Sequence, residues 1–574
     1  MKEGVTMAEI KPVPIGTEDF KEIIDKNCYF TDKSLLIKGL LDSSAKVSLF
    51  SRPRRFGKTV NMSMLKYFFE KSEEDNTYLF DDLQISETGE KYLAHMGQYP
   101  VISISLKSMA KESYKETIEE FKNLIADEYE RHVHILTSNK LTARKRKLFE
   151  HIYNEDASMI TYQKALKILS DCLYVVHQKK VIILIDEYDV PLQNAWLRGF
   201  YQEMVDFIRS LFDTALKTND SLEFGVLTGC LRISKESIFT GLNNLKIYSV
   251  SDAQYSEYFG FTDAEVKKML EFYQLSEHYE MMKAWYNGYL FGRTEIYCPW
   301  DVMNYCDELM HIPDAEPQAY WINTSGNDII RQFISSATAT MKYEMEQLIA
   351  GETITKRINQ ELTYRDLKDN NQDTVKMTEN IWSMLYMTGY LTMCEMPSRG
   401  QFRLRIPNLE IREIFKNQIY ECFRYFVAAR KTDLTEFCMT FRNGDEASAE
   451  RLFSQYLNDV ISIRDNNSPN AKKENFYHGI LLGLFTHMSD WVVKSNVESG
   501  DGYSDILIKI PADKIGIVIE IKFGENKEME EGCNKALKQI DDMCYEKSLL
   551  DDGMTTILKY GIACYKKNCM IKKA

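Results

Sequence analysis

Short apolar runs alternate with longer amphipathic segments along the first half of the chain. The apolar runs have the length and composition of buried strands and lie at 47–50, 100–107, 181–186, 222–228 and 247–250. Segments with helical periodicity separate most of them, for example at 117–131, 162–177 and 200–217. Strands that alternate with helices predict a parallel α/β sheet. The run Val181–Ile185 has no polar break, as expected of a strand that is covered on both faces.

The pattern becomes helical and rich in aromatic residues between residues 261 and 333, which we interpret as a helical extension of the first domain. Further along, helical periodicity at 380–388 stops at Gly389 and is followed by short strands at 391–395 and 402–406, and by a helix from Asn408. Helix, hairpin and helix predict a winged-helix unit within a helical region over 334–465. Such a unit can bind DNA, but inside multidomain ATPases it often serves only as a packing module, which we favour here.

A new compact α/β pattern begins near residue 472. It predicts a helix at 474–484, strands at 491–498, 503–508 and 515–522, and a helix at 535–545. The polar stretch Arg464–Asn470 is the best candidate for a linker. The predicted domains are therefore residues 10–260, 261–333, 334–465 and 470–574, and the predicted fold class is α/β.

Composition excludes some classes of protein. A length of 574 residues predicts about three or four domains, at roughly 150 residues each. The net charge of −14 argues against a chain that coats nucleic acid through bulk electrostatics, although local basic patches are compatible with it. We find no secretory signal, no apolar run long enough to cross a membrane, and no Cys-x-x-Cys pair among the 12 cysteines. These features predict a cytoplasmic protein without a membrane partner.

The residues Ser51–Thr59 follow the first apolar run and precede a helical segment at 60–69. Strand, loop, Gly57-Lys58-Thr59 and helix form the arrangement that binds phosphates through backbone N–H groups and a helix N-terminus. In that arrangement Lys58 reaches the terminal phosphates and the Thr59 hydroxyl joins Mg²⁺. The full motif has a glycine five positions before Gly57, where this chain has Arg52. An ordinary basic loop that caps a helix is the alternative interpretation.

Two further arginines, Arg54 and Arg55, lie within this loop. They could compensate for the missing glycine at the phosphates, contact a neighbouring element, or be solvated. We include both among the candidate nucleotide-binding residues.

Acidic residues follow the strand at 181–186 directly. In phosphate-loop enzymes an acidic residue such as Asp186 holds the Mg²⁺ shell at the strand end, and a second carboxylate such as Glu187 orients the attacking water. The alternative is a strand followed by a polar turn. The pairing with Lys58, about 130 residues upstream, favours the functional interpretation. Thr228, at the end of a later strand, is equally compatible with a sensor of the γ-phosphate and with a capping threonine.

A second set of charged residues lies on the strands of the C-terminal region. Asp505 belongs to one strand, and Glu520 and Lys522 share a face of the next because side chains alternate along a strand. An Asp followed by Glu-x-Lys is the minimal set for metal-assisted phosphodiester hydrolysis, with Mg²⁺ shared by Asp505 and Glu520. Two amphipathic strands with charged outer faces are the alternative. The helix that follows adds the polar residue Gln539.

The first half resembles the AAA-ATPase-like family of bacterial proteins. The resemblance covers residues 10–330 and rests on Pro14-Ile15-Gly16 with Phe20, Tyr29 with Asp32-Lys33-Ser34, Arg52–Thr59, Ile185–Asp189, and Thr228-Gly229 with Phe239–Asn244. The arginine at position 52 resembles that family's own version of the loop. The resemblance implies a fold that binds ATP with Mg²⁺, but it says little about the biological task.

The region 470–565 resembles the PD-(D/E)xK nuclease superfamily. By that resemblance Asp505, Glu520 and Lys522 correspond to the core motif, and Glu474 and Gln539 to accessory positions. Together the two resemblances predict an ATPase coupled to a metal-dependent nuclease that acts on DNA or RNA. The alternative is a nucleotide-dependent switch or adaptor whose C-terminal domain only binds nucleic acid or a partner. The sequence leaves open whether the chain oligomerises.

Overall fold

The computed structural model contains two compact units. Unit 1 consists of Met1–Trp321 and Thr355–Glu410, and unit 2 of Ile322–Ile354 and Ile411–Ala574. The structure describes residues 11–231, 244–321, 339–349, 351–362, 364, 366, 374–398, 400–415, 434–460, 477–478, 480–482, 484–485, 488, 490–499, 502–524, 528–565 and 568–574. Within these residues, no helix is both long enough and apolar enough to cross a membrane.

A five-stranded parallel sheet forms the centre of unit 1, in the order β2-β3-β4-β1-β5. Its strands are β1 (Val47–Ser51), β2 (Val101–Ser105), β3 (Val181–Asp186), β4 (Leu222–Gly229) and β5 (Leu245–Tyr248). The predicted α/β fold class is therefore confirmed. β5 begins two residues earlier than the apolar run at 247–250 suggested, because its first residues pair with the edge of β1 although they are half-exposed.

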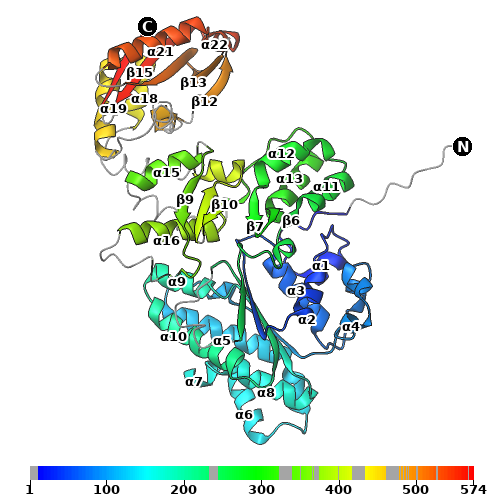
Figure 1. The fold of residues 1–574 in the computed structure, drawn as a ribbon. Helices are drawn as coiled ribbons and strands as arrows, with labels where there is room; N and C mark the ends of the chain where they lie inside the picture. The colour runs from blue at the N-terminus through cyan, green and yellow to red at the C-terminus, as the bar shows by residue number, and fades with distance from the viewer. Residues whose placement is uncertain are drawn as a thin grey trace, which may run out of the picture. The chain divides into compact units, whose positions relative to one another are not determined.

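Helices cover both faces of this sheet (Figure 1). On one face lie α1 (Phe20–Asp25), α2 (Leu35–Asp42), α3 (Lys58–Phe69) and α4 (Glu90–Leu93). The other face is covered by α5 (Tyr114–Arg131), α8 (Ala165–His177) and α10 (Tyr201–Phe212), with α6 (Ala143–Tyr153), α7 (Met159–Tyr162) and α9 (Val190–Arg198) beside them. The complete burial of β3 follows from this cover and agrees with its unbroken apolar sequence.

The remainder of unit 1 combines helices with two small sheets. Helices α11 (Asp263–Phe272), α12 (Tyr279–Tyr286) and α13 (Pro299–His311) accompany the sheet β6-β8-β7, with β6 at Phe261–Thr262, β7 at Tyr289–Phe291 and β8 at Thr294–Tyr297. The sequence predicted only helices here, because strands this short carry no readable periodicity. The second sheet, β10-β11-β9, contains β9 (Ile354–Arg357), β10 (Thr392–Ser398) and β11 (Gln401–Arg405). β9 precedes α16 (Thr374–Met387) in the chain, and β10 and β11 follow it. Gly389, just after α16, has a left-handed φ of 91°.

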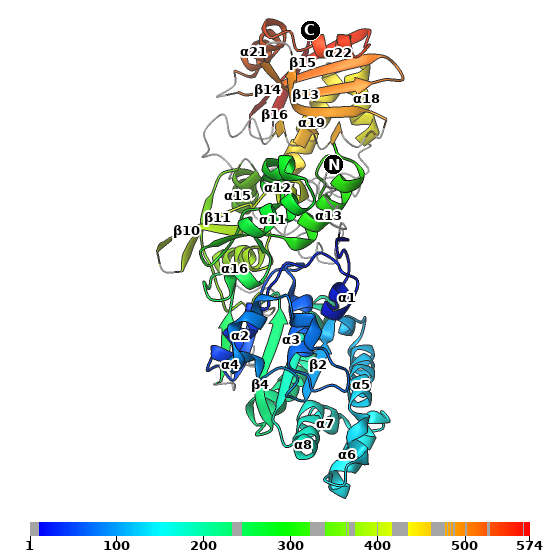
Figure 2. The same cartoon turned by 90° about the vertical axis from the view of Figure 1, so that its right-hand side faces the viewer.

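Unit 2 is built on a mixed sheet in the order β12-β13-β14-β15-β16 (Figure 2). The strands are β12 (Val492–Ser499), β13 (Gly502–Ile510), β14 (Ile515–Phe523), β15 (Thr556–Tyr565) and β16 (Asn568–Lys573). Only the β14–β15 pair is parallel among these described strands. The described helices of this unit include α15 (Ala339–Ile349), α18 (Leu434–Asn443), α19 (Glu446–Val460), α21 (Met529–Asp542) and α22 (Lys547–Asp551).

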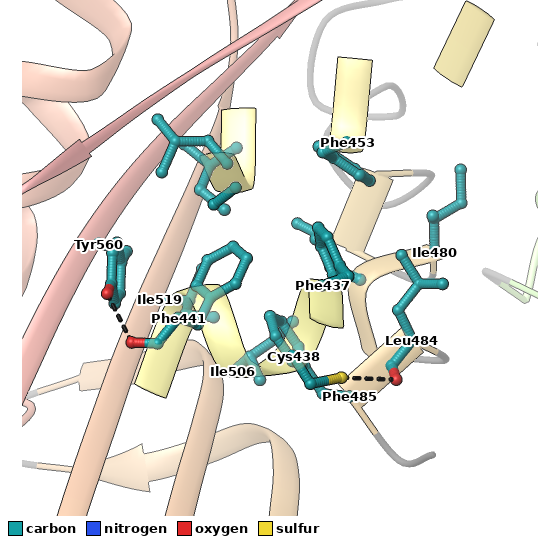
Figure 3. Close-up of a cluster of buried hydrophobic side chains, with 14 of the residues drawn as sticks. Phe437, Cys438, Phe441, Phe453, Ile480, Leu484, Phe485, Ile506, Ile519 and Tyr560 are labelled. Atoms are coloured by element: carbon teal, nitrogen blue, oxygen red, sulfur yellow. Dashed lines mark hydrogen bonds between the residues drawn. The ribbon is translucent and has the colours of Figure 1, made fainter. Parts of the chain in front are cut away.

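The main core of unit 2 lies between α18, α19 and one face of its sheet (Figure 3). Phe441 and Phe485 pack edge to face there, with ring centroids 4.8 Å apart. The Tyr560 hydroxyl donates a hydrogen bond to the Phe441 carbonyl at 2.6 Å, so this hydrogen bond lies within the buried core. Helices α21 and α22 pack on the opposite face, against Leu507 and Val518. Alternation along the strands therefore directs Asp505, Glu520 and Lys522 toward the face that carries α21.

Candidate active sites

In unit 1, the carboxyl ends of three neighbouring strands bring the predicted phosphate-loop residues together. β4 lies between β1 and β3 in space, although β2 separates those two strands in the sequence. In register, Phe50 of β1 pairs with Thr228 of β4, and Ile185 of β3 pairs with Leu227. Thr228 is thus placed between the loop that follows β1 and the acidic residues that follow β3.

Lys58 is almost completely enclosed in this site, with 3% of its surface exposed. Gly57, with φ of 77°, adopts the left-handed conformation immediately before α3, and Lys58 is the first residue of that helix. The Lys58 ammonium donates to the Pro53 carbonyl at 3.1 Å and lies 3.5 Å from Glu187 Oε1. Burial disfavours its charged form, but Cys230 and the neighbouring carboxylates outweigh burial and raise the pKa of Lys58 above its ordinary value. The lysine is therefore cationic at neutral pH.

Asp186 is the acceptor that joins the two sides of the site. Thr59 Oγ1 donates to its Oδ2 at 2.7 Å, and the Thr228 hydroxyl donates to its Oδ1. Burial and the adjacent Glu187 charge raise the pKa of Asp186, while both hydrogen bonds oppose that shift. The Thr59 hydroxyl and the Asp186 carboxylate are the two oxygen donors expected to hold Mg²⁺. Because one hydrogen bond joins them, these two oxygens are close enough to bind the same hard cation.

In unit 2, Asp505, Glu520 and Lys522 come together at the adjoining ends of β13 and β14. The Ile521 N–H donates to Asp505 Oδ2 at 2.8 Å, and Lys522 Nζ donates to Glu520 Oε1 at 2.9 Å. The Asp505 N–H also points to Glu520 Oε2, at 3.4 Å. Two carboxylates and an ammonium thus form one small polar cluster, and Glu520 is only 2% exposed.

Comparisons with known proteins agree with this arrangement. Residues 14–239 match the family model described as predicted AAA-ATPase, and residues 472–574 match that of the PD-(D/E)XK nuclease superfamily. The chain combines an AAA-ATPase-like domain with a PD-(D/E)XK nuclease-like domain. A protein from Azotobacter chroococcum mcd 1, described as an uncharacterized protein in the vnfD 5′ region, is 23% identical over 491 residues. The matched region covers 84% of this chain and 85% of that protein.

The three arginines of the AAA-ATPase-like loop have different surroundings. Arg52 is completely buried and points into the core, where its guanidinium donates to the Tyr248 carbonyl at 2.9 Å. Arg54 donates to Gln193 Oε1 on α9 at 2.9 Å. Arg55 has a left-handed φ of 69°, and its guanidinium carbon lies 3.7 Å from the ring centroid of Trp300. Arg54 and Arg55 both contact neighbouring elements, which was one of the three roles considered for them.

Asp189 is a residue of the AAA-ATPase-like site that the sequence analysis did not single out for a role. Its buried Oδ2 accepts the N–H groups of Cys230 and Leu231, both at 2.9 Å. Burial, reinforced by the charge of Glu187, raises the pKa of Asp189 to about 6. Through these hydrogen bonds Asp189 links the segment after β4 to the segment after β3. In the sequence, its position two residues after Glu187 was the feature that could have identified it as a site residue.

The nuclease-like site differs from the predicted set in its accessory positions. Glu474 lies outside the described residues. Gln539 donates to the Tyr545 hydroxyl at 3.2 Å, and no hydrogen bond joins its described side chain to Asp505, Glu520 or Lys522. His478 instead reaches the site, because its Nε2 lies 2.8 Å from the Asp505 carbonyl, which requires the ring nitrogen to donate. A polar histidine in an otherwise apolar helical segment was the sequence signal for it.

Electrostatics in the nuclease-like site favour a divalent cation. Burial, with the neighbouring Asp505 charge, raises the pKa of Glu520 from its ordinary 4.5 to about 7, although Lys522 opposes the shift. Two close carboxylates with one ammonium leave a net negative charge in a poorly solvated place. A dication relieves that repulsion, so the residues fit a bound metal ion.

Proposed function

We propose that this chain is an ATP-dependent nuclease, in which ATP hydrolysis by the AAA-ATPase-like domain controls metal-dependent cleavage of DNA or RNA by the nuclease-like domain. The observation that carries the proposal is the cluster of Asp505, Glu520 and Lys522. Amphipathic strands with charged outer faces would leave such groups solvated, whereas Glu520 is buried against Lys522. Keeping a buried carboxylate such as Glu520 beside a second carboxylate costs free energy, and carboxyl groups with such perturbed surroundings cluster at functional sites.

In the AAA-ATPase-like domain, each residue has a role that its geometry supports. Lys58 supplies a buried positive charge for the terminal phosphates, and Thr59 with Asp186 would hold Mg²⁺, which neutralises phosphate charge when bound. Glu187 is 16% exposed and lies beside Lys58, where it can accept a hydrogen bond from the attacking water. Thr228 and Thr59 both donate hydrogen bonds to Asp186. We therefore assign Thr228 the role of a γ-phosphate sensor that acts through the Asp186 carboxylate.

In the nuclease-like domain, Asp505 and Glu520 would hold the divalent cation, which supplies a Lewis acid at the phosphorus and an acidified water. Lys522 lies on the same face, where its ammonium can orient the attacking water by donating a hydrogen bond to the water oxygen. His478 fixes the backbone of Asp505 through its hydrogen bond to the carbonyl. Positioning of this kind matters because small displacements of a reacting group lower rates steeply.

The test is cleavage of labelled DNA and RNA by the full chain with Mg²⁺ or Mn²⁺, with and without ATP. We expect Asp505→Asn and Glu520→Gln each to lower cleavage by at least about a hundredfold, as is typical when a catalytic electrostatic contact is removed. Asp551→Asn, an exposed acid of the same unit, serves as the matched control. Unchanged cleavage in Glu520→Gln would show that the activity comes from another site or a contaminant.

A nucleotide-dependent switch or adaptor is the second candidate, favoured by one observation. Gln539, an accessory position by resemblance, is bonded to Tyr545 instead of to the carboxylates. On this hypothesis the C-terminal domain binds nucleic acid without cutting it, and ATP raises thermal stability with no hydrolysis. Lys58→Ala should then remove the stability shift, whereas Lys66→Ala on the same helix should keep it.

We assign the predicted winged-helix region a packing role in either case, and we place the activity in the cytoplasm.

A further inference from the structure

A pair of fully buried carboxyl groups lies in unit 1 outside the sites described above. Asp301 is in α13, and Glu410 is in the helical residues 409–415. Both have 0% exposure. Glu410 Oε1 accepts the Trp321 N–H at 2.8 Å. Among the described residues, no donor reaches Glu410 Oε2 or either carboxyl oxygen of Asp301.

The two carboxyl groups are close enough to hydrogen bond with each other once one of them is protonated. Two ionised carboxylates in contact and away from water repel strongly, so one shared proton is the stable state. Burial raises the pKa of Asp301 to about 6, and it raises that of Glu410 well above its ordinary value. The shared proton also satisfies oxygens that otherwise have no donor.

Arg55 is the cation that faces this pair. The other titratable groups that face it are Cys298, Tyr286, Tyr289 and Tyr320. Burial raises the pKa of each of these, so all four are neutral at physiological pH. The Arg55 guanidinium lies on Trp300, the residue before Asp301, and the Cys298 thiol donates to the Arg55 carbonyl at 3.7 Å. Both side chain and backbone of Arg55 are thus held by the segment that carries Asp301.

We propose that Trp300, Asp301 and Glu410 are positioning residues for Arg55, and that binding of a nucleoside polyphosphate at the loop is linked to uptake of a proton by the Asp301–Glu410 pair. The inference rests on the proposed function, since it requires that the loop bind nucleotide. When phosphates attract the Arg55 guanidinium, the pair loses the positive charge that compensates its single negative charge. The remaining carboxylate oxygen then takes a proton from solvent, and the pair becomes neutral.

This linkage has a definite sign. A complex that holds an extra proton is favoured at low pH, so nucleotide affinity falls as pH rises through the neutral range. Uptake of one full proton corresponds to about a tenfold weaker affinity per pH unit. Glu410 is also the last residue of unit 1 before the chain enters unit 2. The proton is therefore taken up at the end of unit 1, directly before the chain enters unit 2.

The experiment is titration calorimetry of the full chain with ADP and Mg²⁺ at neutral pH, in two buffers that differ in ionisation enthalpy. The buffer dependence of the heat gives the number of protons taken up. Asp301→Asn and Glu410→Gln each replace one carboxyl group of the pair with an amide. The amide can still hydrogen bond to the remaining carboxyl group, but it cannot take up a proton. Asp307→Asn, on the same helix, is the matched control. Protons that the nucleotide itself exchanges are common to all variants and cancel in the comparison.

We expect the wild type and Asp307→Asn to take up between about 0.3 and 1 proton more than Asp301→Asn or Glu410→Gln, and to lose affinity more steeply with pH. Equal proton uptake in wild type and both pair variants would overturn the inference while leaving nucleotide binding intact. Absence of ADP binding to the wild type would instead overturn the proposed function. Should Asp301→Asn fail to fold, Glu410→Gln carries the comparison. Trp300→Phe should keep the proton uptake, because a phenyl ring still supports a guanidinium, whereas Trp300→Ala should lower ADP affinity.

Discussion

At the scale of single residues, Arg52 explains how a phosphate loop can lack its first glycine. Its guanidinium donates to the carbonyls of Ser51 and Tyr248 and lies over the rings of Phe259 and Phe291, at 5.2 and 5.4 Å. Burial lowers its pKa to about 10, which still leaves it charged at neutral pH. Because this side chain points away from the loop's phosphate-facing side, the position does not need the absence of a Cβ. Arg52 therefore acts as a structural residue of unit 1.

This assignment predicts that restoring the standard motif is harmful. Arg52→Gly recreates the glycine but removes a buried side chain and the hydrogen bonds that it donates to the Ser51, Tyr248 and Tyr255 carbonyls. We expect it to lower the free energy of unfolding of unit 1 by about 3 kcal/mol or more, from the lost hydrogen bonds and packing. Urea unfolding of the full chain measures this, with the exposed Arg144→Ala as the control. A variant as stable as the wild type would mean that Arg52 contributes nothing to the core.

A second residue-scale prediction concerns Glu520, whose pKa is raised to about 7. The folded state binds this proton more tightly than the unfolded state does. The resulting stabilisation is present below the ordinary pKa of 4.5 and is lost as pH rises through about 7. Without metal, the free energy of unfolding of unit 2 should fall over this range by at most ~3 kcal/mol, and Glu520→Gln should remove that slope. Urea unfolding in EDTA at several pH values checks it. The slope should also flatten when Mg²⁺ is added, and a slope that persists in Glu520→Gln contradicts the assignment.

At the scale of helices and strands, the sequence allowed a correct prediction wherever the pattern lay within a single element or its end. The parallel sheet could be predicted because β3 and its neighbours are apolar runs of strand length. The loop Ser51–Thr59 and the Asp186-Glu187 pair could be found because each is a local motif at a strand end. The contact between Asp301 and Glu410 could not be predicted, because it joins residues about a hundred positions apart without a motif. The contacts of Arg52 with β5 and of Asp189 with the segment after β4 also depend on tertiary packing.

The end of β4 lies close to the segment after β3, and this contact gives a prediction at this scale. A Cβ on Gly229 would lie 2.6 Å from Asp189 Oδ1 and 2.6 Å from the Tyr188 ring. Gly229→Ala should therefore push the end of β4 away from the segment after β3 and separate Thr228 from Asp186. We expect ATP hydrolysis to fall by about tenfold or more, with a smaller effect on nucleotide affinity, because the affected contacts position the reacting groups.

Gly225→Ala, in the same strand, is the matched control for that substitution. Its Cβ would meet the far end of the Leu216 side chain at 3.1 Å, which can move. Steady-state ATPase assays on both variants, with nucleotide affinity measured separately, distinguish the two cases. Equal loss in Gly225→Ala and Gly229→Ala would indicate general damage to β4 instead of a specific effect on its end.

At the scale of the whole molecule, one polypeptide joins an AAA-ATPase-like domain to a nuclease-like domain. If the first controls the second, substitutions should separate the two activities in one direction only. Glu520→Gln should abolish cleavage and leave ATP hydrolysis within about twofold of the wild type, because Glu520 belongs to the nuclease-like site and the predicted ATPase residues lie in unit 1. Lys58→Ala should lower ATP hydrolysis by about a hundredfold. It should also bring cleavage in the presence of ATP to the level measured without nucleotide. Lys66→Ala, about two turns further along the same helix, should change neither activity. Should Lys58→Ala retain a full response of cleavage to ATP, the two domains would be independent enzymes on one chain, and coupling would have to be abandoned.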